Sequence, residues 1–227
     1  MMSSLKIATL NCQGQTGITT TKALFIDDLL NRTKYDILNL QETFIKEETF
    51  EYCGHIERNY NILSNNSPNN YGTACLVKNN LSIKDLRLDM EGRIIMFEIN
   101  NFLFANIYPK SGTDTISRQS RENMFSSTLP NMIGFNSDNM VLAGDWNCII
   151  ENNDATHLPE IKASPSLKRL VQTFDIKDDF RKIHGKSRVF SRYYTKQTTV
   201  DGATRLDRIY SSKKLVAKTA SYVPAAI

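Results

Sequence analysis

The stretch Val141–Asn147 has the sequence VLAGDWN, an apolar run that ends on an acid with an aromatic and a polar neighbour. A second run of the same kind, Ile37–Glu42, has the sequence ILNLQE. Both predict buried strands that deliver Glu42 and Asp145 to the edge of a sheet. Open α/β enzymes place their chemistry at such strand ends. The alternative is that each acid only starts a surface turn, but two such runs favour a functional site.

Length and composition are those of a globular protein. The chain has 227 residues, enough for one large domain or two small ones, and 41% of them are hydrophobic, enough to bury a core. The four cysteines are far apart and show neither CxxC nor zinc-finger spacing, which disfavours a zinc site. The sequence shows no signal peptide and no run approaching the roughly 20 apolar residues of a membrane span. We therefore expect a soluble intracellular protein.

Charge is unevenly distributed along the chain. The net charge is +4, but residues 181–227 contain 11 Lys and Arg against only two acids. The remaining 180 residues are net acidic. Such a basic segment often forms only a solvated face of the protein. On an otherwise acidic domain it also suits a polyanion partner such as nucleic acid.

Short apolar runs broken by turn residues predict strands through most of the chain. These runs are Lys6–Leu10, Asp36–Leu40, Tyr60–Leu63, Ala74–Val77, Leu81–Leu88, Arg93–Ile99, Leu103–Tyr108, Met140–Ala143, Val189–Tyr194 and Leu206–Tyr210. The pairs Asn79-Asn80 and Asn100-Asn101 lie between such runs and predict tight hairpin turns, because Asn tolerates positive φ. The middle of the chain is therefore expected to be an antiparallel meander.

Helices are predicted at Thr21–Asn31, at Ser117–Leu129 and from Ser164-Pro165 to about Phe174. Thr21 and Ser164 are the predicted N-caps, and proline suits the first helical position that follows Ser164. The polar segment Tyr194–Arg205 contains Asp201-Gly202, which predicts another hairpin turn. Many strands with a few helices between them indicate one α/β domain built on packed sheets.

Three more polar residues stand at the ends of predicted strands. Asn11 follows the first run, Tyr108 ends the run before Pro109, and Asp207 lies between Leu206 and Arg208. Taken singly, Asn11 is more often a capping residue and Tyr108 a core aromatic. Asp207 alone would most simply be a partner of a neighbouring arginine.

Together, these pieces resemble the endonuclease/exonuclease/phosphatase superfamily. Five signatures occur in the expected order: Thr9-Leu10-Asn11, Leu40-Gln41-Glu42-Thr43, Asn106-Ile107-Tyr108-Pro109, Gly144-Asp145-Trp146-Asn147 and Leu206-Asp207-Arg208-Ile209. Within the superfamily, the chain is most similar to the apurinic-like endonuclease domain of non-LTR (LINE-type) retrotransposons.

This resemblance implies a DNase I-like fold, a four-layer α/β sandwich of two packed mixed sheets flanked by helices. It also implies a single endonuclease domain over residues 1–227. The family closes its site with a Ser-Asp-His segment, and the chain is expected to stop just before it. His55, His157 and His184 occupy no matching position, so the 227 residues are expected to nick DNA weakly or not at all. Position 146 is Trp where Phe is common, a mild change.

The resemblance also assigns roles to the residues at the strand ends. Glu42 is the expected ligand of Mg²⁺, with Mn²⁺ as the alternative ion. Asp145 is expected to activate the attacking water as a general base. The remaining catalytic residues are expected to be Asn11, Tyr108, Asn147 and Asp207, which hold phosphate or water or orient the histidine.

DNA contacts are expected from the basic C-terminal quarter. The expected DNA-binding residues are Arg188, Ser191, Arg192, Lys196, Arg205 and Arg208. The hairpin predicted between Tyr194 and Arg205 is expected to reach the DNA groove and to influence where the enzyme nicks.

The resemblance predicts a Mg²⁺-dependent endonuclease that nicks one strand of double-stranded DNA and leaves a 3′ hydroxyl. In the retrotransposon family this hydroxyl primes reverse transcription by a downstream domain of the same polyprotein, so the site of action would be the nucleus. One alternative is a cellular apurinic/apyrimidinic repair endonuclease. Those enzymes usually carry an acid where Gln13 stands, which disfavours that alternative. A catalytically inactive DNA-binding module is the other alternative.

Overall fold

A computed structural model describes residues 4–14, 17–68, 71–134, 138–156, 163–196 and 199–223, without the side chains of 195, 196, 199 and 200. The described residues fall into two compact units, one within Met1–Tyr108 and one within Pro109–Pro224. The expectation of one endonuclease domain over 1–227 stays a prediction. Within the described ranges, no helix is both long and apolar enough to cross a membrane. All four cysteines are buried and free.

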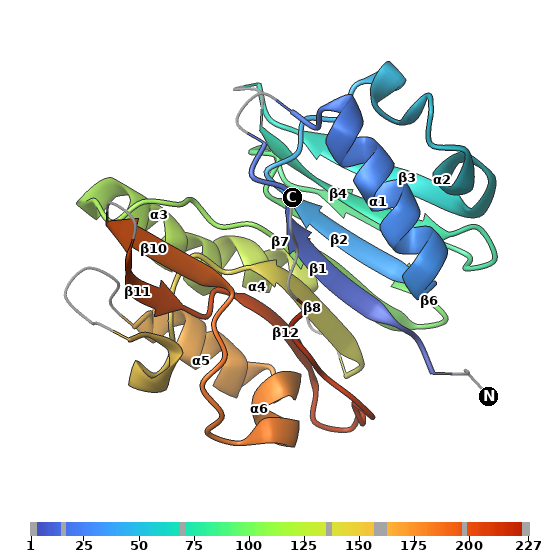
Figure 1. The fold of residues 1–227 in the computed structure, drawn as a ribbon. Coiled ribbons are helices and arrows are strands. Elements are labelled where there is room, and N and C mark those ends of the chain that lie inside the picture. Colours follow the sequence, from blue (N-terminus) through green and yellow to red (C-terminus); the bar gives the residue numbers. More distant parts are fainter. Residues whose placement is uncertain are drawn as a thin grey trace. The chain divides into compact units, whose positions relative to one another are not determined.

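The first unit contains a four-stranded sheet in the order β1-β2-β4-β3, visible in Figure 1. Its strands are β1 (Ile7–Asn11), β2 (Ile37–Gln41), β3 (Tyr60–Asn66) and β4 (Gly72–Lys78). The strands β1 and β2 are parallel, and the other pairs are antiparallel. Every residue of β2 is buried, as a strand covered on both faces requires. The prediction that this run is a buried strand ending at Glu42 is therefore confirmed.

One face of this sheet is covered by helices. The parallel pair β1 and β2 needs a crossover, and α1 (Thr20–Thr33) supplies it. Ala23, Ile26 and Leu30 lie on one side of α1 and are buried together with Leu38 and Leu40 of β2. Two further helical elements, η1 (Glu47–Phe50) and α2 (Gly54–Asn59), both contact α1. We did not predict either of them from the sequence. The helix α1 is capped by the hydroxyl of Thr19, two residues before the predicted cap.

The first unit also contains the meander β5 (Lys84–Leu88), β6 (Ile94–Ile99) and β7 (Phe102–Ile107). Asn100 and Asn101 both have positive φ, 51° and 65°, and form the predicted tight turn between β6 and β7. The pair Asn79-Asn80 also turns, but it connects β4 to a strand of a different sheet and therefore makes no hairpin. The predicted meander is confirmed for β5–β7 only.

A buried polar contact fixes the packing of these two sets of strands. The amide oxygen of Asn106 on β7 accepts a hydrogen bond of 2.6 Å from Gln41 on β2. The amide nitrogen of Asn106 donates to the carbonyls of Leu40 and Ala74. Asn106 and Gln41 are fully buried, so this satisfied network fixes how β2 and β4 lie on β7.

In the second unit, β8 (Met140–Asp145), β12 (Asp207–Ser212) and β9 (Ile176–Asp178) pair antiparallel in that order. The helical elements are α3 (Thr115–Asn123), the π segment η2 (Met124–Thr128), α4 (Leu129–Ile133), η3 (Asn152–Asp154), α5 (Pro165–Thr173) and α6 (Asp179–His184). Trp146 is completely buried, with its ring centroid 4.9 Å from that of Tyr210. The predicted cap of α5 is confirmed, because the Ser164 hydroxyl accepts from the amide of Leu167 at 3.1 Å.

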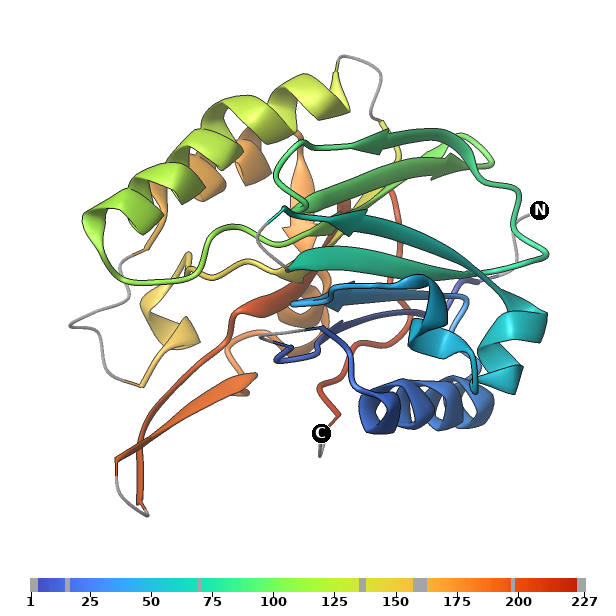
Figure 2. The same ribbon diagram turned by 90° about the horizontal axis from the view of Figure 1, so that it is seen from above.

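The strands β10 (Arg192–Lys196) and β11 (Thr199–Thr204) form the predicted hairpin, which extends outward from its base in Figure 2. We predicted the turn at Asp201-Gly202, and that position was wrong. Lys196 pairs with Thr199, and residues 197 and 198 lie outside the described residues. Asp201 is instead an extra residue where the register shifts between Tyr194 and Thr195, a β-bulge. A turn-type dipeptide within a strand often marks such a bulge.

Candidate active site

The end of β2 brings together three of the predicted catalytic residues within the first unit. One carboxylate oxygen of Glu42, Oε1, accepts a hydrogen bond of 3.0 Å from the amide Nδ2 of Asn11. The same oxygen accepts a hydrogen bond of 2.9 Å from the hydroxyl of Tyr108. Asn11 reaches Glu42 because β1 and β2 are parallel and in register, with Asn11 opposite Gln41.

The backbone around Glu42 is unusual for its residue types. Glu42 and Gln13 have positive φ, 52° and 48°, a conformation that costs energy outside glycine and often occurs at functional sites. The side-chain oxygen of Asn11 accepts from the amide of Gln13 at 2.8 Å and supports this turn. A Cβ at Gly14 would lie 2.5 Å from the Glu42 carbonyl, so only glycine fits there. Gly14 carries no reactive group, so no motif in the sequence marked it as part of the site.

The chemistry of this cluster suits a divalent cation. The two groups that contact Oε1 are uncharged, so they orient the carboxylate without neutralising it. Mg²⁺ usually binds to one or two carboxylates and keeps several of its waters. A single acid such as Glu42 can therefore be enough to hold it. Among the described residues, no group of three or more His, Cys, Asp or Glu could enclose a metal. One carboxylate with uncharged neighbours is a donor set that fits a divalent cation which keeps several waters.

The end of β8 positions a second cluster, in the second unit. Asp145 is almost fully buried, and its Oδ1 accepts from the backbone amide of Asn147 at 3.0 Å. Asn147 has a positive φ of 48°, and its amide Nδ2 donates to the carbonyl of Pro109 at 2.9 Å. The glycine before Asp145 also has positive φ, 151°. This sharp exit from the strand holds both side chains in fixed orientations.

Asp207 lies directly opposite Asp145 where β12 pairs with β8. Burial, and then the negative charge of Asp145, raises the pKa of Asp207 to about 7. Within the described residues, the carboxylate oxygen Oδ1 of Asp207 is buried without a hydrogen-bond partner. A buried acid that lacks a partner on one oxygen is suited to hold a proton or to pair with a cationic group.

Ser191 fixes the backbone at Asp207 and is not aimed at solvent. Its Oγ accepts from the amides of Leu206 and Asp207, at 3.0 and 3.1 Å. Tyr222 donates its hydroxyl to the Asp207 carbonyl at 2.5 Å. These contacts give Ser191 a positioning role, whereas we had expected it to contact DNA.

Arg205 and Arg208, predicted to contact phosphate, are buried and hold carboxylates instead. The Nε of Arg205 donates to Asp154 at 2.9 Å, and its Nη2 to Asp178 at 2.7 Å. The Nη2 of Arg208 is 3.4 Å from Asp154. A guanidinium inside such a network is not accessible to a DNA backbone, so this prediction was wrong for both residues.

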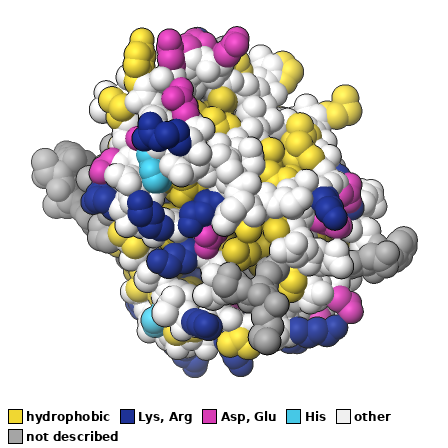
Figure 3. Space-filling model, turned by 90° about the vertical axis from the view of Figure 1, so that its right-hand side faces the viewer, with side chains coloured by type: hydrophobic (Ala, Val, Ile, Leu, Met, Phe, Trp, Pro, Cys, Tyr) yellow, Lys and Arg dark blue, Asp and Glu magenta, His cyan; other side chains and the backbone are white. Residues whose placement is uncertain are grey.

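Arg188 and Arg192 remain candidates for phosphate contact, because both are exposed. The guanidinium of Arg188 lies 5.6 Å from the centre of the Phe190 ring, and that of Arg192 lies 5.4 Å from the Tyr194 ring. The side chain of Lys196 is outside the described residues. On the face drawn in Figure 3, Lys and Arg side chains are interspersed with acidic, apolar and uncharged ones.

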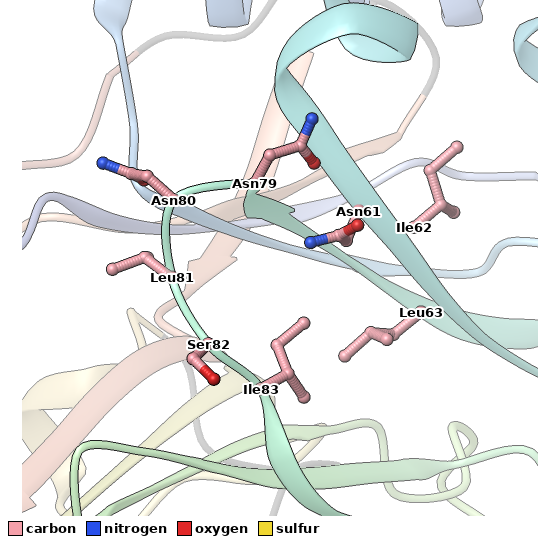
Figure 4. Close-up of a pocket in the computed structure, with 8 residues that line it drawn as sticks. All are labelled: Asn61, Ile62, Leu63, Asn79, Asn80, Leu81, Ser82 and Ile83. Atoms are coloured by element: carbon pink, nitrogen blue, oxygen red, sulfur yellow. The ribbon is translucent and has the colours of Figure 1, made fainter.

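A cavity of about 620 Å³ lies elsewhere in the first unit, lined by Asn61–Leu63 and Asn79–Ile83 (Figure 4). None of the side chains that line it is titratable, and none belongs to the predicted site. It therefore offers no group for acid–base or metal chemistry.

The chain belongs to the endonuclease/exonuclease/phosphatase family, whose model matches residues 8–227. An AP endonuclease from Archaeoglobus fulgidus has a similar structure, with 22% identity, a TM-score of 0.71, and 93% of this chain and 88% of that chain covered. A 3′-5′ exonuclease from Neisseria meningitidis is also similar, with 18% identity, a TM-score of 0.73, and 92% and 88% covered. A 3′ phosphatase from Neisseria bound to a product DNA hairpin has 16% identity, a TM-score of 0.72, and 93% and 88% covered.

No curated protein sequence matches the chain significantly. The predicted superfamily and the predicted fold class, the DNase I-like α/β sandwich with mixed sheets flanked by helices, are confirmed by the family match and the similar structures. The similarity to retrotransposon endonucleases and the roles of individual site residues stay predictions.

Proposed function

We propose that the protein is a Mg²⁺-dependent endonuclease that nicks one strand of DNA and leaves a 3′ hydroxyl. The observation that carries this proposal is the carboxylate of Glu42, held by two uncharged donors at the end of β2. Membership of the endonuclease/exonuclease/phosphatase family supports a phosphodiester as substrate. DNA is the proposed polymer because the similar structures include AP endonucleases and an enzyme bound to a DNA hairpin.

Each cluster supplies a different part of the reaction. Glu42 would hold the cation, which when bound supplies positive charge against the phosphoryl oxygens. Asn11 and Tyr108 keep the Glu42 carboxylate in one orientation. Asp145 is the proposed base that accepts a proton from the attacking water, and the backbone amide of Asn147 fixes one of its oxygens. Asp207 is the proposed partner of a cationic group near the leaving oxygen.

A plasmid assay tests this proposal on the protein in its full natural length. Supercoiled plasmid is incubated with Mg²⁺ or with a chelator, and a polymerase then tests whether the nick can be extended from a 3′ hydroxyl. Glu42→Gln keeps the shape of the side chain but removes its charge. Glu48→Gln, at an exposed acid of η1, is the matched control.

We expect Mg²⁺-dependent, extendable nicks that Glu42→Gln strongly reduces and Glu48→Gln does not. Equal activity of the two variants would remove Glu42 from the metal site. Absence of nicking under all conditions would instead favour the catalytically inactive DNA-binding module.

We further propose that the nick serves target-primed reverse transcription in the nucleus, with double-stranded DNA and a reverse transcriptase domain as partners. Gln13, where repair enzymes usually carry an acid, supports this choice. The similar structures include AP endonucleases from Archaeoglobus fulgidus and Leishmania major, which makes a repair endonuclease the second candidate. Duplexes with and without one abasic site separate the two. A strong preference for the abasic duplex would indicate repair, and efficient nicking of undamaged DNA would support the retrotransposon role.

A further inference from the structure

The hairpin of β10 and β11 presents an aromatic side chain to solvent. Tyr193 is 60% exposed, although it lies in a regular strand pair opposite the buried Ala203. Its neighbours along β10 are Arg192, which is exposed, and Tyr194, whose hydroxyl is 3.1 Å from that of Thr204. Successive side chains of a strand point to opposite faces, so Tyr193 is on the other face of the hairpin from Arg192 and Tyr194.

The base of this hairpin is firmly held, which distinguishes it from a loose surface loop. The amide of Ser191 donates to the Thr204 carbonyl at 3.0 Å. Thr156 exchanges two hydrogen bonds with Ala203, one from each residue's amide, at 3.0 and 2.8 Å. The ring of Tyr193 is therefore presented from a fixed backbone. A rigid aromatic loses little conformational entropy when a partner covers it.

Positive charge lies on and just before β10, although Arg192 is on the face opposite to Tyr193. Arg188 and Arg192 are exposed, and each guanidinium is held against a neighbouring aromatic ring. Charges held in this way complement a phosphate backbone. Basic side chains with interleaved aromatic ones are the pattern of proteins that bind single-stranded nucleic acid, where rings stack on bases and cations follow the backbone.

We propose that Tyr193 stacks on an unpaired base of the DNA substrate, and that this contact makes the protein prefer DNA with a single-stranded segment. The inference rests on the proposed function, because it takes DNA as the substrate. Within an intact duplex each base is already stacked on its neighbours, so the ring has no base face to cover. Arginine contacts to phosphate are available in both kinds of DNA. Tyr193 therefore provides the preference for DNA with a single-stranded segment, and Arg188 and Arg192 provide affinity for both kinds of DNA.

Binding is measured by fluorescence anisotropy, in a chelator so that no cleavage occurs, on an intact duplex and on the same duplex with a short single-stranded gap. The variants are Tyr193→Ala and Tyr193→Phe. Tyr52→Ala is the matched control, since Tyr52 is 71% exposed in the first unit and follows Glu51 instead of an arginine. Stacking of one base is worth about 1–3 kcal/mol, so Tyr193→Ala should weaken gapped-DNA binding about 5- to 150-fold.

We expect Tyr193→Ala to leave duplex binding close to that of the parent, Tyr193→Phe to bind gapped DNA like the parent, and Tyr52→Ala to change neither. If Tyr193→Ala binds gapped DNA as tightly as Tyr52→Ala does, the stacking contact does not exist. An equal loss on both DNAs would also overturn the preference. A parent that binds DNA with this preference but never nicks would contradict only the proposed catalytic function. A parent that binds neither DNA would contradict both proposals.

Discussion

Replacement of Asp154 by alanine tests whether the buried charge network of the second unit stabilises it. Asp154 is only 1% exposed. Its Oδ1 contacts Arg181 at 2.6 Å and Arg205 at 2.9 Å, and its Oδ2 is 3.4 Å from Arg208. Burial raises the pKa of Asp154, but the charges of Arg208 and Arg205 more than offset this and hold the pKa below its usual value. Asp154 is therefore ionised at neutral pH.

The expected loss of stability in Asp154→Ala depends on which partners each arginine has left. Arg205 retains Asp178 as a partner, whereas the guanidinium of Arg208 retains only the carbonyl of Arg205 among its described hydrogen-bond partners. The Nε and Nη1 of Arg208 are already buried without partners in the described structure. Removal of one member of a buried ion pair costs about 3–5 kcal/mol, because the other charge stays buried. For a chain of this size, that loss lowers the melting temperature by about 6–20 °C.

Urea unfolding followed by tryptophan fluorescence is a suitable assay. Trp146 is the only tryptophan of the chain and is fully buried in the second unit, so its emission reports on that unit. Asp138→Ala is the control, because Asp138 and Lys214 form an exposed pair at 3.0 Å that should contribute less than about 1 kcal/mol. Asp154→Ala together with Arg208→Met should cost less than Asp154→Ala alone, since no uncompensated Arg208 charge remains.

The pH dependence gives an independent check. The folded pKa of Asp154 lies below the unfolded value of about 3.9, so its stabilisation is present above that value and is lost as the pH falls through the folded pKa. The difference between the parent and Asp154→Ala should therefore shrink in acid. A loss at pH 7 no larger than that of Asp138→Ala would refute the stabilising role of the network.

Three further predictions concern the site and its surroundings. Asp145→Asn should lower the nicking rate about 10²- to 10⁴-fold, the usual effect of losing a general base, and turnover near the parent rate would exclude that role. Because the pKa of Asp207 is raised to about 7, its ionisation opposes folding increasingly as the pH rises from 3.8 towards 7. Asp207→Asn should thus raise the urea midpoint more at pH 8 than at pH 4, and equal shifts would contradict the raised pKa. The double change Arg188→Ala and Arg192→Ala should flatten the salt dependence of DNA binding, whereas the control Lys213→Ala and Lys214→Ala should not. Identical slopes for the two double variants would mean that Arg188 and Arg192 do not contact phosphate.

Local rules of the sequence correctly predicted much of the framework. The apolar runs that end at Glu42 and Asp145 are buried strands, because a continuous apolar run fits a strand covered on both faces. Asn100 and Asn101 form a tight turn because asparagine accepts positive φ, and Ser164 caps a helix because its hydroxyl reaches an amide three residues ahead. Each of these features depends on residues close together in the chain.

Contacts between distant residues were decided only by the tertiary structure. Asn11 and Tyr108 lie 31 and 66 positions from Glu42, and only the pairing and packing of strands brings them to one carboxylate oxygen. Arg188 and Arg205 look alike in a basic segment, yet one is exposed and the other is buried against Asp154 and Asp178. A side chain's charge is a property of its residue type, whereas its burial and its partners depend on which distant segments the fold packs around it.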